Sequence, residues 1–240
     1  MLQRLCVLLT VGAALAPATA NAHYLWVTLD RGDGPRGRVN IYFEEAPAVG
    51  DGSYLDPFLD TSETWFRTVE QIEPKPLALV EKRTGEKKRW MTAPLPAAAP
   101  WSVECHWLFG VYQYGETPVL LHYYARRLDV DSHEDLHELS RAEKMALDIV
   151  PHDLGDKMEL KVVWNGAPVA DRLVHVRGPN GFKKNVRTDE RGVVRFRTDA
   201  AGEYSFRTSV EEPKAGRHDG ENYDLIRHNA TLIMTLPLSK

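Results

Sequence analysis

Short segments in which apolar and polar residues alternate recur along the chain, and this pattern limits its possible folds more than any other feature. In residues 24–29 and 158–164 every second side chain is apolar. Because successive side chains of a β-strand point to opposite faces of a sheet, such alternation predicts strands with one buried face. Turn signals rich in Gly, Pro, Asn and Asp separate the segments. We therefore predict an all-β fold of two β-sandwich-like domains, with one short helix near their junction.

The spacing of the segments changes after Pro151. From there on, short alternating segments follow one another regularly and are separated by turns such as NGAP, PNG and DERG. Regular short strands of this kind are typical of a small β-sandwich. We predict an N-terminal β domain in residues 23–155 and an immunoglobulin- or transthyretin-like sandwich in residues 156–240.

Residues 131–149 are the one segment that convincingly predicts a helix. Asp131 or Ser132 can cap its start, and Pro151 lies just beyond its end. The segment contains HEDLH at residues 133–137, which matches the His-Glu-x-x-His pattern of zinc peptidases. Its flanks are charged, whereas such a zinc-binding helix is usually apolar there, so we interpret the match as a solvated helix start and a peptidase as a minor alternative.

The first residues have the pattern of an export signal. Arg4 precedes an apolar core, and Ala20-Asn21-Ala22 fits the small-x-small cleavage rule. The apolar run is too short to span a bilayer. We predict that residues 1–22 are removed, that the mature protein begins at His23 and is periplasmic or secreted, and that it has no integral membrane segment.

Cleavage leaves one cysteine and a mildly acidic chain. Cys6 is removed, so Cys105 remains alone, and a buried small apolar side chain is a better interpretation of it than a reactive thiol or a soft metal ligand. The net charge changes from −4 to −5, because the removed segment contains Arg4 and no acid. This charge gives no reason to expect a nucleic-acid partner.

Five segments, in this order, resemble a bacterial periplasmic domain family of unknown function that is often associated with nickel and cobalt uptake. They are AHYLW, FGVYQYGETPVLLHYYARRL, ALDIVPHDLGDKMELKVVWNGAPVADRLVHV, TDERGVVRFRTDAAGEYSFRT and RHNATLIMTLP, which begin at residues 22, 109, 146, 188 and 227. The resemblance implies two all-β domains and a role in handling a transition metal. The chain has no dense loop of His and Met residues, so this role depends on a few side chains.

His23 is the first candidate ligand. A terminal amine has an ordinary pKa near ~8 and an imidazole near ~6.5, so both bind a metal readily at neutral pH. On a terminal histidine the amine and Nδ1 can close one chelate ring, and a second histidine would complete a histidine brace. The alternative is that His23 is a solvated terminal residue.

His106 and His122 are the next candidates, because they lie on opposite arms of a predicted hairpin with its turn near Gly115. Regular pairing places both side chains on one side of the sheet, facing one another or diagonal. A bulge at Gly110 would break this inference. Cys105 should point to the opposite face. The alternative for each histidine is a hydrogen-bonded residue in a half-buried sheet. His228, within one of the family-like segments, is a fourth candidate ligand or a structural residue.

We expect a non-enzymatic metal-binding component of nickel or cobalt uptake. The expected ligands are His23 with its amine, His106 and His122, and the C-terminal sandwich would be a scaffold or a docking module for a membrane transporter. A copper protein with a histidine brace, either a carrier or an oxidative enzyme, is the alternative, because copper(II) outbinds nickel(II) at nitrogen donors. A metal-free cell-surface binding module is the third possibility.

Overall fold

The computed structural model describes residues 23–32, 36–85, 88–155 and 157–238, and the predicted signal peptide lies outside this range. Within it the chain is mostly β-strand, arranged in several sandwich-like sheets with two short α-helices, which confirms the predicted all-β class. No helix of the described residues is long and apolar enough to cross a bilayer.

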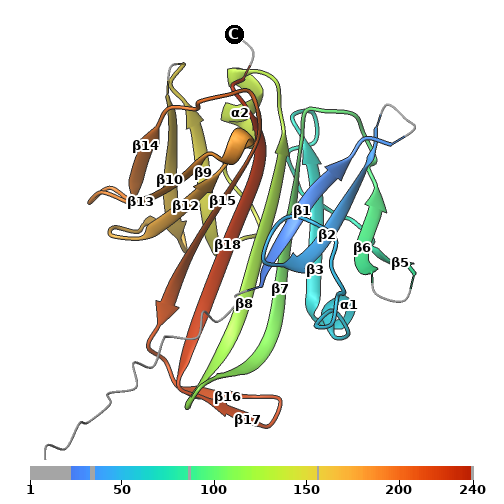
Figure 1. Cartoon of the computed structure of the whole chain (residues 1–240), viewed down its shortest axis with the longest axis vertical. Helices are drawn as coiled ribbons and strands as arrows, with labels where there is room; N and C mark the ends of the chain where they lie inside the picture. The colour runs from blue at the N-terminus through green and yellow to red at the C-terminus, as the bar shows by residue number, and fades with distance from the viewer. Residues whose placement is uncertain (1–22, 33–35, 86–87, 156, 239–240) are drawn as a thin grey trace, which may run out of the picture.

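An eight-stranded sheet forms the middle of the molecule (Figure 1). Its strands, in spatial order, are β13 (Lys183–Arg187), β12 (Leu173–Arg177), β15 (Gly202–Glu212), β18 (Leu225–Leu236), β8 (Thr117–Asp129), β7 (Trp101–Tyr114), β3 (Ser62–Thr68) and β4 (Lys75–Pro76). β18 and β8 pair in parallel, and the other neighbours pair antiparallel. We call this the central sheet.

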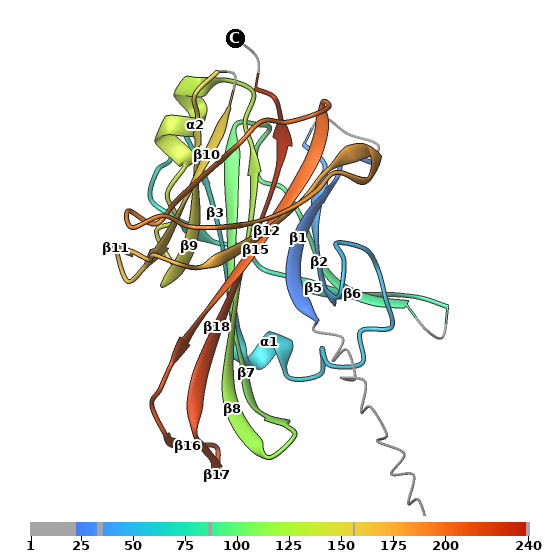
Figure 2. The same ribbon diagram turned by 60° about the vertical axis from the view of Figure 1, so that its left-hand side comes forward.

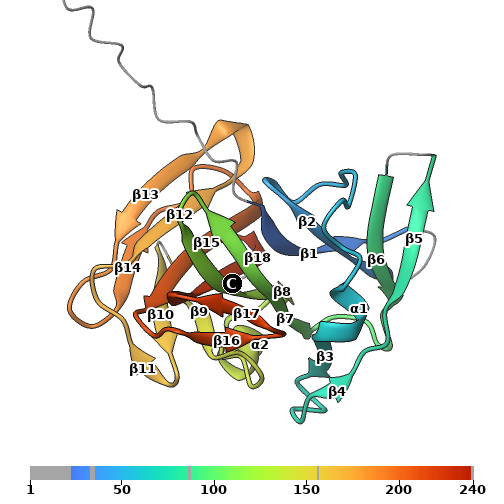
Figure 3. The ribbon, with the colours of Figure 1, turned by 90° about the horizontal axis from the view of Figure 1, so that it is seen from below.

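Two further sheets cover opposite faces of the central sheet (Figures 2 and 3). One consists of β1 (Tyr24–Asp30), β2 (Arg38–Glu44), β6 (Lys88–Pro94) and β5 (Val80–Thr84). The other consists of β11 (Ala167–Pro168), β10 (Met158–Trp164) and β14 (Val193–Phe196), with β9 (Leu147–Asp153) paired to β10. A small hairpin of β16 (Gly216–His218) and β17 (Glu221–Tyr223) lies near the β7–β8 turn.

The layers enclose two hydrophobic cores. β8 contributes to both, because its side chains alternate between faces: Tyr123 packs in the core beneath β1 and β2, and Tyr124 packs in the core beneath β9 and β10. β18 and β8 pair within one sheet although they come from the two predicted domains. The division of the chain into residues 23–155 and 156–240 stays a prediction.

The predicted hairpin around Gly115 is present as β7 and β8. Gly115 adopts a φ of +60°, which suits glycine in a tight turn. The register shifts between Leu108 and Gly110, so the irregularity considered from the sequence does occur. His106 lies opposite Tyr124 and His122 lies opposite Leu108. The two histidines are therefore diagonal neighbours on one face. The expectation that a bulge at Gly110 would separate them was wrong, because the register from the turn, continued without the shift, would place them on opposite faces.

The helix predicted for residues 131–149 is much shorter. Helix α2 spans His133–Leu139, and the Ser132 side chain caps it by accepting a hydrogen bond from the Asp135 backbone N–H. Residues 147–153 form β9 instead, because Leu147 and Ile149 alternate into a core and the segment pairs with β10 along its whole length. A second helix, α1 (Phe58–Thr61), and a 3₁₀ turn at Pro179–Gly181 were not predicted.

Candidate metal centre

Three histidines lie in a row across adjacent strands on one face of the central sheet. His106 comes from β7, His122 from β8 and His228 from β18, where His228 lies directly opposite His122. We call these three residues the histidine stripe. A glutamate stands at each end: Glu63 lies opposite His106 on β3, and Glu212 on β15 approaches His228. The fold thus gathers nitrogen and carboxylate donors from five strands.

His106 and His122 are joined by a hydrogen bond. Nε2 of His106 and Nδ1 of His122 are 3.0 Å apart, the ring centroids are 5.3 Å apart, and the ring planes differ by 4°. This head-to-head arrangement requires one ring to donate an N–H to the other. His122 in turn stacks on His228, with centroids 4.9 Å apart and planes at 22°.

Burial keeps the stripe uncharged. Burial, together with the weaker effect of neighbouring histidines, lowers the pKa of His122 to about 4 and that of His228 to about 3. Burial also lowers the pKa of His106, against the opposing effect of Glu63. All three imidazoles are therefore neutral at pH 7, and the neutral form is the one that binds a metal.

His228 is the most enclosed member of the stripe. Its exposed fraction is 4%, and Trp164 at the end of β10 packs against it with ring centroids 4.1 Å apart. Its Nδ1 lies 3.4 Å from the Tyr124 hydroxyl. Among the described residues its buried Nε2 has no hydrogen-bond partner, although a carboxylate oxygen of Glu212 lies 3.5 Å away. A buried polar atom without a partner is uncommon in folded proteins and calls for an explanation such as a bound ion or water.

The stripe supplies ligands but is not arranged around an ion. In the described part of the chain, no group of three or more His, Cys, Asp or Glu side chains is placed to hold a metal. Two nitrogens 3.0 Å apart can share one ion with bonds of about 2 Å, but their lone pairs must then converge on it. Metal binding therefore requires the His106 and His122 rings to rotate out of their hydrogen bond.

His23 lies on the other side of the central sheet. Its ring neighbours are Phe43 and Tyr54, at centroid distances of 5.5 and 5.4 Å, and its Nε2 is 3.8 Å from Glu44. It lines a cavity together with Tyr123, whose side chain points away from the His122 side of β8. The structure does not bring His23 together with His106 and His122. No second imidazole is among the ring contacts of His23 in the described residues.

Cys105 and the HEDLH segment also have defined places. Cys105 is fully buried in the core beneath β1 and β2, burial raises its pKa to about 12, and it points away from the stripe, which confirms the buried interpretation. His133 contacts the His152 ring at 5.5 Å, whereas the His137 side chain is 72% exposed. The capped, solvated start of α2 is thus confirmed.

Four neighbours of the stripe were not identified from the sequence: Glu63, Tyr124, Trp164 and Glu212. Tyr124 follows His122 by two residues, so its place on the same face was readable from the period of a strand. The other three come from β3, β10 and β15, which are distant in sequence, and only the tertiary pairing brings them close.

Comparisons with known proteins show only distant similarity. No known protein family and no curated protein matches the chain. A solved structure of domains NIE to MG1 of alpha-2-macroglobulin from Escherichia coli is 11% identical, over 91% of this chain and 99% of that one, with a TM-score of 0.24. The D0-D1 domain of intimin is 10% identical, over 87% and 96%, with a TM-score of 0.23. Values this low establish neither a shared family nor a shared function.

Proposed function

We propose that the chain is an exported protein that binds a divalent transition metal through the histidine stripe. The observation that carries the proposal is the contact of three neutral imidazoles in a row, with the Nε2 of His228 buried and unpartnered among the described residues. The proposal retains His106, His122 and His228 as ligands. It leaves His23 out of this set, because His23 lies on the other face of the central sheet.

The donors favour borderline metals. Imidazole nitrogens bind cobalt, nickel and copper with affinities that rise in that order, so nitrogen chemistry alone favours copper. The sequence resemblance implies nickel or cobalt uptake in the periplasm. Glu63 and Glu212, one at each end of the stripe, could complete the coordination with carboxylate oxygens. A copper histidine brace at His23 has weaker support, because a brace needs a second imidazole beside the terminal residue.

Metal binding would replace the hydrogen bond between His106 and His122 with bonds from both rings to the ion. The hydrogen bond between His106 and His122 breaks, the N–H proton that it holds moves to the other ring nitrogen, and both freed lone pairs turn to the ion. Because the rings are already neutral at pH 7, the ion does not have to displace protons. A site that is held on a rigid sheet and covered by Trp164 suits storage or delivery to a membrane transporter, and we propose this role rather than catalysis.

The test is calorimetric titration of the mature chain with cobalt, nickel and copper(II) at pH 7. We expect one ion per chain, and we expect His122→Ala to weaken binding by about a hundredfold, since loss of one ligand removes roughly 2–3 kcal/mol. His137→Ala is the matched control, because that histidine is solvent-exposed on α2. Unchanged affinity in a His106→Ala, His122→Ala double variant that still folds would refute the proposal.

A further inference from the structure

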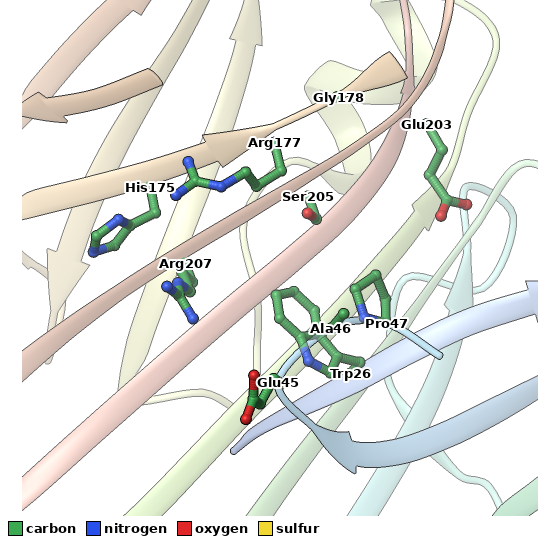
Figure 4. Close-up of a pocket in the computed structure, with 10 residues that line it drawn as sticks. All are labelled: Trp26, Glu45, Ala46, Pro47, His175, Arg177, Gly178, Glu203, Ser205 and Arg207. Atoms are coloured by element: carbon green, nitrogen blue, oxygen red, sulfur yellow. The ribbon is translucent and has the colours of Figure 1, made fainter. Parts of the chain in front are cut away.

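A second site candidate lies on the opposite face of the central sheet from the histidine stripe. A cavity of about 380 Å³ lies between strands β12 and β15 on one side and strand β1 with the loop after β2 on the other (Figure 4). Its lining includes Trp26 and Pro47 on one side and Arg177, Ser205 and Arg207 on the other. We call this cavity the arginine cleft.

One wall of the cleft is basic. His175 pairs with Arg207 and Arg177 pairs with Ser205 across β12 and β15, so the three basic side chains project from the same face (Figure 4). Burial and the charge of Arg207 both lower the pKa of Arg177. A second cavity of about 200 Å³ shares His175 and Arg207 and adds Arg172 and Arg187 to its lining. Asp171 also lines this second cavity and is ion-paired with Arg187, so Arg187 adds little net charge to the positive side of the cleft.

The two central arginines lack acidic partners. In the part of the chain that the structure describes, neither Arg177 nor Arg207 lies within ion-pair distance of a carboxylate, whereas Arg127, Arg187 and Arg227 each do. Arg207 instead lies over the ring of Tyr24, with its guanidinium carbon 4.3 Å from the ring centroid. Two neighbouring guanidinium groups without an ion-paired carboxylate repel one another, so an anion placed between them would be favoured.

The facing wall is largely apolar. Trp26 donates its indole N–H to the backbone oxygen of Glu44, so its ring contributes an apolar surface beside Ala46 and Pro47. Two acids also line the cleft. Glu203 is ion-paired with Arg127, and Glu45 is solvent-exposed on the loop after β2. The cleft thus combines an apolar wall with a basic one, the usual composition of a small-molecule site.

We propose that the arginine cleft binds a small organic anion. Its carboxylate or phosphate would accept hydrogen bonds from the guanidinium groups of Arg177 and Arg207, whose planar forks match either group. Its apolar, planar body would pack against Trp26 and Pro47. The site shares no residue with the histidine stripe, so the proposal does not depend on metal binding.

The test is calorimetric titration of the mature chain with benzoate, phenyl phosphate and benzylammonium. We expect both anions to bind and the cation not to bind; the preference between the anions distinguishes a carboxylate ligand from a phosphate ligand. Arg207→Gln should weaken anion binding about tenfold or more, since hydrogen bonds to charged groups contribute about 1.5–3 kcal/mol. Arg227→Gln is the matched control, because it removes the same charge from a residue that is paired with Glu211.

A variant with the opposite expected effect keeps the test decisive. Glu45→Gln removes a negative charge from the cleft, so it should tighten anion binding about twofold or more. Thermal denaturation without ligand shows whether each variant folds. If Arg207→Gln does not fold, Glu45→Gln and Arg177→Gln carry the comparison. The proposal is overturned if neither anion binds the parent chain, if benzylammonium binds equally well, or if the folded cleft variants, Arg207→Gln or Arg177→Gln and Glu45→Gln, bind anions as the Arg227→Gln control does.

Discussion

At the scale of single residues, the neutral state of the stripe makes stability depend on pH. In the unfolded chain His122 and His228 titrate near the ordinary value of about 6.5, whereas in the folded chain their pKa values are about 4 and about 3. Between these values the unfolded state binds more protons than the folded state. Stability therefore rises with pH in this window and falls as the solution is acidified.

We expect the free energy of unfolding of the metal-free chain to fall by about 5 kcal/mol between pH 7 and pH 4.5, since each of the two histidines contributes nearly two pKa units and one unit corresponds to about 1.4 kcal/mol. Urea denaturation at the two pH values measures this. The variant His122→Gln, His228→Gln cannot take up these protons, so its loss of stability should be smaller. An equal loss in parent and variant would show that other groups cause the pH dependence.

At the scale of elements, the hairpin and the cap of α2 were predictable because their signals are local. Gly115 marks the turn, and Ser132 precedes the helix that it caps. The fate of residues 147–153 was not predictable locally, because the partner strand β10 and the core decide it. A bulge at Gly110 was considered from the sequence, but its effect was predicted wrongly: it brings His106 and His122 to one face as diagonal neighbours instead of separating them.

The bulge itself can be tested by substitution. Gly110 adopts a φ of +105°, which side chains other than that of glycine rarely accept, although a Cβ there would meet no atom within 4 Å. We expect Gly110→Ala to lower the free energy of unfolding by about 1–3 kcal/mol through backbone strain alone. Urea denaturation measures the change. A variant as stable as the parent would contradict the positive φ.

At the scale of the whole molecule, the candidate site was only partly predictable from the sequence. The shared face of His106 and His122 was predicted from regular pairing, but in the structure it depends on the register shift between Leu108 and Gly110, which the period of a strand does not encode. The position of His23 depends on which face of the central sheet the β1–β2 layer covers, and no local pattern encodes that choice. The contribution of His228 depends on the parallel pairing of β18 with β8, which joins segments about a hundred residues apart.

The layering predicts the effect of extending the chain at its start. Two residues added before His23 block its terminal amine, but the stripe lies on the other side of the central sheet. We expect the extended protein to bind the same number of metal ions per chain, with affinity within about twofold of the parent. The measurement is the metal content of each protein after dialysis. Intact mass shows at which residue each chain begins. A loss of metal on extension would return His23 to the ligand set.

The central claim is that the histidine stripe holds the metal, and the most direct measurement of it is anomalous diffraction from crystals of the mature chain loaded with nickel or cobalt. We predict one strong peak about 2 Å from ring nitrogens of His106 and His122, with those two rings rotated out of their hydrogen bond. A peak beside His23, or no ordered peak at the stripe in fully loaded protein, would contradict it.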